Sequence, residues 1–142
     1  MAQVHDVAAY ILGERRSMTA MKLQKLVYYA QVWSLVWEED PLFPERIEAW
    51  ANGPVSPDLY KVHRGAFRLD RWPKGDPGNL SEQGRGTVDA VLKFYGDMTA
   101  QKLSDMTHAE EPWSKTREGL NPRARSNREI THALMHEYYS GL

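Results

Sequence analysis

The chain has 142 residues, of which 42% are hydrophobic and 26% charged, with a formal net charge of −1 and no cysteine. A chain of this length can bury a core of its own, so we expect one domain over residues 1–142. The near-zero net charge gives no general attraction to nucleic acid or to anionic membranes, and the lack of cysteine excludes disulfides, thiolate metal sites and a thiol nucleophile. The first residues lack the pattern of a signal peptide, and a cytoplasmic location is expected.

The N-terminal third of the chain predicts two helices. Apolar residues recur with helical spacing over residues 4–12, and Gly13 is expected to end this first helix. Residues 18–37 then predict one long helix, with Thr19 as its N-cap and Pro41 limiting its continuation. This segment is apolar on nearly all sides, which is typical of a helix surrounded by protein, so we place it at the centre of the fold. Its lysines and glutamines argue against a membrane span.

The next stretch predicts a small β element and a short helix. Residues 46–51 alternate polar and apolar side chains, as a strand does, and the turn-forming residues 52–54 (Asn-Gly-Pro) follow them directly. Ser56 then has the character of an N-cap, and Pro57 that of a first helical residue. The short helix that they begin should end at Gly65.

The C-terminal half of the chain predicts further helices. One begins after Ser81 and ends at Gly96, and shorter ones begin near Thr99 and Pro112. Residues 126–129 (Ser-Asn-Arg-Glu) match a capping box, which predicts that the last helix begins there. Together the elements predict a mainly α fold: a single compact helical domain around one long buried central helix, with at most a small β-hairpin or short strand.

Residues 66–80 give the weakest signals of regular structure, and the breaker-rich stretch 71–78 is expected to be an exposed loop. In and before this segment, basic residues alternate with aromatic ones: Lys61, His63, Arg64, Phe67, Arg68, Arg71, Trp72 and Lys74. Such a mixture suits single-stranded nucleic acid, but Asp70 and Asp76 interrupt it and the whole chain is not basic. A contact with another protein, or an ordinary solvated loop, fits the run better.

A metal site is the other chemistry that the sequence suggests. His132 and His136 are four residues apart on a predicted helix, so both imidazoles can face one way, and His108 or Glu111 could add a third ligand. Zinc proteases with this spacing carry a glutamate directly after the first histidine, where this chain has Ala133. The alternative interpretation is that both histidines are polar positions on the outer face of the helix.

Three motifs give the chain a family resemblance. They are residues 21–31 (Met-Lys-Leu-Gln-Lys-Leu-Val-Tyr-Tyr-Ala-Gln) with Trp33, residues 47–55 (Ile-Glu-Ala-Trp-Ala-Asn-Gly-Pro-Val) with Tyr60, and residues 103–113 (Leu-Ser-Asp-Met-Thr-His-Ala-Glu-Glu-Pro-Trp). In this order they resemble the Panacea domain, a family often described as phage-associated. The chain departs from the family at Ser34, near which other members often carry a histidine.

The resemblance implies an antitoxin of a type II toxin–antitoxin system. Such a protein would neutralise a protein toxin, often one that blocks translation, by direct stoichiometric binding. It implies a helical domain with a small β element, and it implies no catalytic residue, metal or cofactor. The motifs consist mostly of core and turn residues, so they indicate a shared scaffold and leave the choice of partner to other positions. For contact with the toxin we expect these exposed aromatic and basic residues: Trp37, Tyr60, Arg64, Arg68, Arg71 and Trp72.

Three alternatives to the antitoxin remain open at the sequence level. An adaptor that delivers a bound protein to an ATP-dependent protease would use the same kind of surface. A metal-dependent hydrolase would need the histidines at positions 108, 132 and 136, and a nucleic-acid-binding protein would need the basic run. Trp37 and Tyr60 could also be core residues, because large aromatic side chains are usually well buried.

Overall fold

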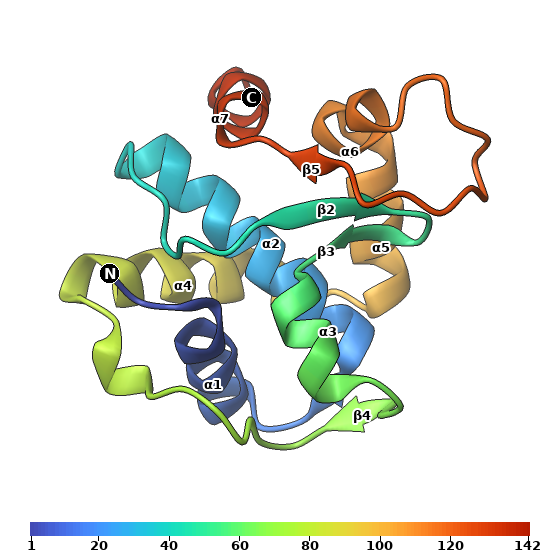
Figure 1. Cartoon of the computed structure of the whole chain (residues 1–142). Helices are drawn as coiled ribbons and strands as arrows, with labels where there is room; N and C mark the ends of the chain where they lie inside the picture. Colours follow the sequence, from blue (N-terminus) through green and yellow to red (C-terminus); the bar gives the residue numbers. More distant parts are fainter.

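The computed structural model describes the whole chain, residues 1–142, and most of it is helical (Figure 1). The seven α-helices are α1 (Val4–Arg15), α2 (Ala20–Trp37), α3 (Pro57–His63), α4 (Glu82–Tyr95), α5 (Ala100–Ala109), α6 (Glu111–Thr116) and α7 (His132–Ser140). The strands are β1 (Met18–Thr19), β2 (Ile47–Trp50), β3 (Gly53–Val55), β4 (Arg68–Leu69) and β5 (Glu129–Ile130), and one 3₁₀ helix, η1, spans Pro77–Asn79. The prediction of a mainly helical fold with a small β element is confirmed.

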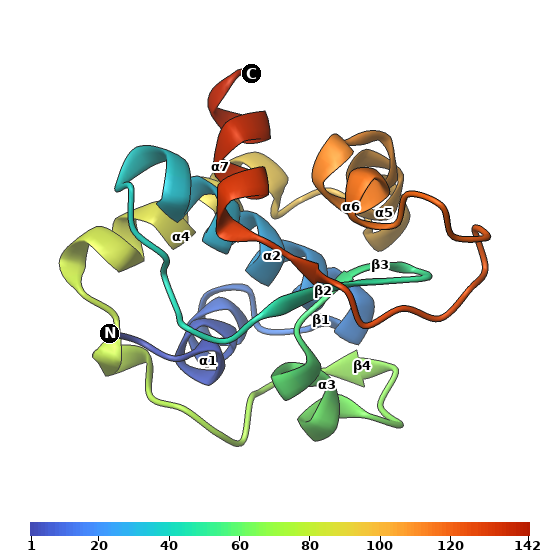
Figure 2. The same ribbon diagram turned by 45° about the horizontal axis from the view of Figure 1, so that its top comes forward.

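Helix α2 is the longest, with 18 residues, and it packs against α1, α4, α5 and α7. As predicted, Thr19 is its N-cap: the Thr19 hydroxyl accepts a hydrogen bond from the Lys22 N–H, 3.1 Å away. At the other end, the Ser34 hydroxyl donates to the Asp40 carbonyl at 2.7 Å and so fastens the chain that leaves the helix. Figure 2 shows α7 beside α2, with β5 leading into it from the sheet.

Two antiparallel sheets connect segments that are far apart in the sequence. In the larger sheet β2 lies between β3 and β5, with Glu48 opposite Val55 on one side and opposite Glu129 on the other. The smaller sheet pairs β1 with β4, and Met18 lies opposite Leu69. The larger sheet therefore fixes the β2–β3 hairpin to the chain before α7, and the smaller sheet fixes the start of α2 to the chain after α3.

One hydrophobic cluster of 30 buried residues forms the core and runs from Ala2 to Tyr139. All helices except α6 contribute buried apolar side chains to it, and Trp113 of α6 packs against it from a partly buried position. Gln31 of α2 is also fully buried and crosses to the chain before β2. Its side-chain oxygen accepts from the N–H groups of Leu42 (2.7 Å) and Phe43 (3.3 Å), and its nitrogen donates to the Phe43 carbonyl (2.9 Å). None of the helices combines the length and apolar character that crossing a bilayer requires.

The start of the last helix was predicted wrongly. Helix α7 begins at His132, and the Thr131 hydroxyl caps it by accepting from the Leu134 N–H at 3.2 Å. Glu129, the expected partner in a capping box, lies in β5, and the Ser126 hydroxyl accepts from the Arg128 N–H instead. Pairing with β2 holds residues 129–130 extended, and this tertiary contact overrides the local capping signal.

The stretch 71–78 was expected to be an exposed loop, but part of it is bound to α1. Trp72 is only 8% exposed, and its indole N–H donates to His5 Nδ1 at 3.1 Å. The buried Asp6 carboxylate accepts from the Asp76 N–H at 2.7 Å and from the Asn79 side chain at 3.3 Å. Gly75 lies directly against the His5 backbone. Contacts with α1 therefore place Trp72 in the core, and the sequence around Trp72 does not predict them.

Candidate protein-binding pocket

A pocket of about 910 Å³ lies between α2, the β2–β3 hairpin, α3 and the loop before β5. It is larger than the hollow of about 300 Å³ beside Met1 and Leu80. The residues with most bearing on its chemistry are Met21, Gln24, Lys25, Glu48, Trp50, Tyr60, His63, Arg64 and Arg125. Several of them belong to the first two motifs of the sequence, so the motifs meet at this pocket.

Lys25 of α2 lines the pocket and is nevertheless 98% buried within the chain. Its Nζ donates one hydrogen bond, 3.4 Å long, to the Asn52 carbonyl. Burial lowers the pKa of the Lys25 ammonium to about 8. The Gly53 backbone packs closely against the end of the side chain, since a Cβ at Gly53 would lie 2.8 Å from Nζ.

Gln24 and His63 tie α2 to α3 on the next side of the pocket. The Gln24 side-chain oxygen accepts from the Ser56 N–H at 2.8 Å, and its nitrogen donates to the Ser56 carbonyl at 3.1 Å. The same nitrogen lies 3.0 Å from His63 Nε2. Because it can only donate, we assign Nε2 as the acceptor of a neutral imidazole. Burial also lowers the pKa of His63, which agrees with the neutral form.

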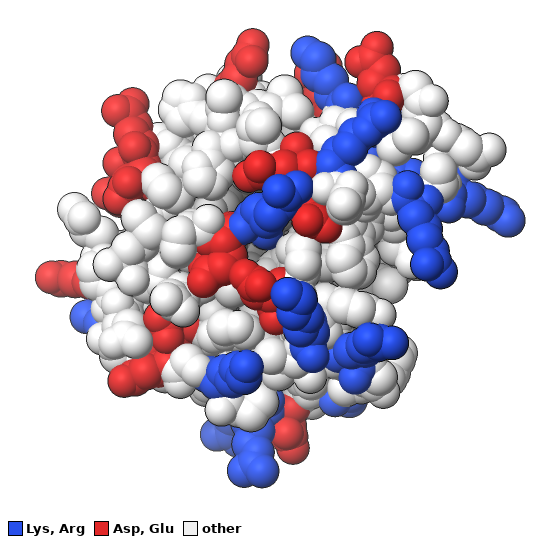
Figure 3. Space-filling view, in the orientation of Figure 1, with Lys and Arg blue, Asp and Glu red and all other residues white.

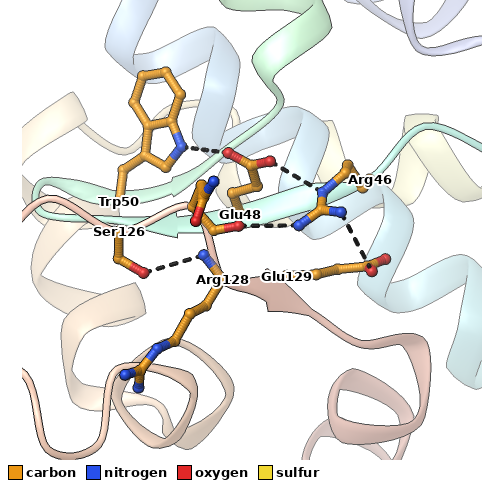
Figure 4. A network of polar contacts seen from close by, with 7 residues as sticks. Arg46, Glu48, Trp50, Ser126, Arg128 and Glu129 are labelled. Atoms are coloured by element: carbon orange, nitrogen blue, oxygen red, sulfur yellow. Dashed lines mark hydrogen bonds and ion pairs between the residues drawn. The ribbon is translucent and has the colours of Figure 1, made fainter.

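Glu48 of β2, together with Arg46 just before that strand, positions the Trp50 indole (Figure 4). The Trp50 indole N–H donates to one Glu48 oxygen at 2.8 Å, and Arg46 Nε lies 3.0 Å from the other. Arg46 also donates to the Asn127 carbonyl at 2.9 Å, which links β2 to the loop before β5. Both oxygens of Glu48 are therefore occupied by neighbours in the chain.

Arg117 holds the loop that carries Arg125 to the pocket. Arg117 is buried, and its guanidinium donates to the Ala49 carbonyl of β2 at 2.9 Å and to the Ala124 carbonyl at 2.7 Å. It also lies over the Trp113 ring, 5.4 Å from the centroid. The backbone of residues 121–124 thus wraps around one side chain from α6's C-terminal end.

The structure brings only two of the six predicted contact residues to the pocket, Tyr60 and Arg64. Arg68 is exposed on β4, where its Nε donates to the Ser17 hydroxyl. Arg71 is exposed in the segment that follows β4. Trp72 is buried. Trp37, half exposed, stacks on Trp33 at the C-terminal end of α2, whereas the pocket residues Met21 and Lys25 belong to its first turns.

Sequence reasoning missed Lys25, Trp50 and Arg125 as site residues. A signal for Lys25 was present, because a lysine within a helix that is apolar on nearly all sides must either be buried or open to a cavity. Arg125 gave no such signal, since its place depends on the Arg117 contacts and on the pairing of β5 with β2.

A second polar cluster lies inside the molecule, where α2, the α5–α6 junction and α7 meet. One Glu110 oxygen accepts hydrogen bonds from the hydroxyls of Tyr29 (2.7 Å) and Tyr139 (2.8 Å). The Tyr139 and Tyr28 hydroxyls lie 3.0 Å apart. Burial raises the pKa of Glu110 above its usual range, and the two tyrosine hydrogen bonds only partly oppose that effect.

Replacing Glu110 with alanine or with glutamine tests this cluster. Alanine leaves the Tyr29 and Tyr139 hydroxyls without an acceptor, so we expect the free energy of unfolding to fall by about 1–3 kcal/mol. Glutamine keeps an acceptor oxygen and should cost less.

The raised pKa of Glu110 in the folded state also makes stability depend on pH. The folded chain binds the Glu110 proton more tightly than the unfolded chain does. This stabilisation is fully present below the unfolded-state pKa and is lost as the pH rises through the folded-state pKa. Urea unfolding across this range should therefore show wild-type stability decreasing relative to the glutamine variant as pH rises; a constant difference would contradict the shift.

The histidines suggested as metal ligands are not gathered into one site. His108 Nδ1 lies 2.7 Å from the Ser104 carbonyl of its own helix, and His132 Nε2 lies 3.4 Å from Gln31. The structure contains no group of three or more His, Asp or Glu side chains placed to hold one metal ion. The ligand set that a metal-dependent hydrolase would need is therefore not assembled.

Comparison with protein families gives one match. Residues 23–114 match the family described as "Antitoxin SocA-like, Panacea domain". A search of curated proteins and a search of solved structures each found no match to this chain. The matched segment covers more than half of the chain, from the first turn of α2 into α6, and includes Lys25, Trp50 and Tyr60 of the pocket. The chain therefore belongs to the SocA-like Panacea domain family, whose members are antitoxin-like.

Proposed function

We propose that the protein is the antitoxin of a type II toxin–antitoxin pair, and that it neutralises a cognate protein toxin, one that inhibits translation, by stoichiometric binding at the pocket. The observation that carries the proposal is the coincidence of the family motifs with a pocket whose rim is exposed and apolar. Met21 and Tyr60 line the pocket and are 46% and 37% exposed. The backbone of Phe67 also lies at the start of α2, where its carbonyl accepts from the Ala20 N–H, and its side chain is 80% exposed. Exposed apolar side chains that gather around one pocket are typical of protein contact sites.

The charge distribution favours an acidic partner surface. In Figure 3, lysine and arginine side chains gather at the lower and right-hand edges of the face, over α3, β4 and the loop before β5, whereas acidic side chains lie more to the left and centre. Arg64 and Arg125 are the basic residues of this set that line the pocket. Complementary charge would speed association and select the partner.

Co-expression with the product of the adjacent reading frame tests the proposal. We expect that product alone to arrest growth, co-expression to restore growth, and the two proteins to co-purify at a fixed ratio. Restored growth without a complex would contradict neutralisation by binding. A toxin level that falls only when an ATP-dependent protease is present would identify a proteolytic adaptor instead.

Alanine variants locate the contact surface. Replacing Tyr60 and Arg64 together should weaken toxin binding by about 30-fold or more, because aromatic and arginine side chains at the centre of an interface contribute most to affinity. Phe94→Ala is the matched control, since Phe94 is an exposed aromatic residue of α4 outside the pocket lining. Isothermal titration calorimetry gives both affinities. A larger loss of affinity in Trp37→Ala than in the double variant would indicate that the toxin contacts the C-terminal end of α2 instead.

A further inference from the structure

Lys25 carries a charge that the folded chain leaves without a counter-ion. The three ion pairs of the structure join Arg15 to Asp97 and Arg46 to Glu48 and Glu129, and none involves Lys25. An ammonium group has three N–H donors, and only the 3.4 Å contact with the Asn52 carbonyl uses one of them. Burying a charge without a partner is unfavourable, so the Lys25 ammonium lowers the folding stability of the free protein.

The hairpin closes one side of the ammonium group and leaves the other side to the pocket. Gly53 has a φ of +128°, a backbone conformation that side-chain-bearing residues rarely adopt, and it places bare backbone against Lys25 Cε and Nζ. The side chain cannot retreat in that direction. Lys25 and Asn52, whose carbonyl accepts from Nζ, both line the pocket, so the pocket is the side from which an occupant can approach the ammonium group.

The charged groups of the pocket make it attractive to an anion. Lys25, Arg64 and Arg125 contribute positive charge from α2, the end of α3 and the loop before β5. The acidic group among the lining residues is Glu48 of β2, whose two oxygens are already occupied by Trp50 and Arg46. His63 of α3 is neutral in the tautomer assigned above. A single buried ammonium with two exposed guanidinium groups suits the single charge of a carboxylate, and Trp50 and Tyr60 can contact its aliphatic stem.

We propose that the pocket receives an aspartate or glutamate side chain of the protein partner, and that the Lys25 ammonium forms the buried ion pair with its carboxylate. This inference rests on the proposed function, because it names the chemical group by which the toxin is recognised. It makes Lys25 a binding residue for the partner, with Arg64 and Arg125 as the outer cations that attract the same group.

Replacing Lys25 with methionine tests the ion pair, because methionine keeps an unbranched side chain and removes the charge. We expect toxin binding to weaken by about 30-fold or more, since loss of one member of a buried charge pair leaves the other unpaired. The free variant should be at least as stable to urea as the wild type, because a buried charge without a counter-ion has been removed. Lys102→Met on the exposed face of α5 is the matched control and should bind like the wild type.

The pH dependence of binding gives a second readout. Burial lowers the pKa of Lys25 to about 8 in the free chain, and a bound carboxylate would raise it. Wild-type affinity should therefore decrease as the pH rises from 7 to 9.5, with proton uptake on binding near the upper end, and the methionine variant should lose this decrease. Carbon-13 NMR of the Lys25 ε-methylene group, with and without the toxin, should show the pKa raised in the complex.

Amide substitutions of the toxin's acidic residues identify the other member of the pair. One Asp→Asn or Glu→Gln change should weaken wild-type binding as much as Lys25→Met does, and combining the two should cause little further loss. Unchanged affinity and pH dependence in Lys25→Met, or a loss that no amide substitution reproduces, would overturn the ion pair. If the wild-type chain itself does not bind the product of the adjacent reading frame, the proposed function fails before the ion pair is tested.

Discussion

Replacing Gln31 with alanine is expected to lower the free energy of unfolding by about 3–5 kcal/mol, the largest effect expected of any side chain outside the apolar core. The substitution leaves two N–H groups and one carbonyl of Leu42 and Phe43 without the hydrogen bonds they make to Gln31. It also opens a cavity beside Phe43, which is fully buried. Urea unfolding followed by circular dichroism measures the loss.

Gln101→Ala is the matched control for this prediction. Gln101 is exposed on α5 and donates only to Asp105, at 2.9 Å. Its removal should change the free energy of unfolding by less than about 0.5 kcal/mol, as for most surface positions. Equal losses for the two glutamines would show that the Gln31 contacts do not hold the link between α2 and β2.

Replacing Gly75 with alanine is expected to cost about 3 kcal/mol or more. Gly75 has a φ of +81°, which already disfavours alanine, and a Cβ there would lie 2.5 Å from the carbonyl carbon and oxygen of His5. Those atoms belong to the backbone at the start of α1 and cannot rotate away. The chain 71–79 should therefore lift from α1, and limited proteolysis of this segment should become faster as stability falls.

Gly65→Ala separates the two causes of that loss. Gly65 has a nearly equal φ of +88°, but no atom lies within 4 Å of the position that a Cβ would take. Only the backbone strain applies, so the expected cost is about 1–2 kcal/mol. If Gly75→Ala costs no more than Gly65→Ala, the close approach to His5 does not contribute.

The helix starts that the sequence predicts correctly depend on neighbours within three residues. Ser56, Ser81 and Thr99 each cap a helix by accepting from the N–H three positions on, as Thr19 does. Such bonds form wherever the local chain permits, so their pattern is visible in the sequence. The start of α7 was missed for the opposite reason, because pairing between β5 and β2 decides it over more than 80 residues of chain.

The pocket could be predicted only in part for the same physical reason. Tyr60 and Arg64 were chosen for their chemistry, and they line it. Trp72 was chosen by the same rule, but His5 and the core bury it. Arg125 reaches the pocket through the pairing of β5 with β2 and through the contacts of the buried Arg117, and neither can be predicted from the spacing of residues along the chain.

The way in which Arg117 holds its loop has a consequence for the evolution of specificity. Its guanidinium contacts the carbonyl groups of Ala49, Asn121, Pro122 and Ala124, and every residue type has a carbonyl group. The loop can therefore exchange its side chains, including the one beside the pocket, without losing its anchor. Residues 118–128 lie outside the segment that matches the family. Strand β2, to which Arg117 anchors this loop, lies inside it. A lineage could retarget this wall by point mutation, and a combinatorial library could diversify it, on an unchanged framework.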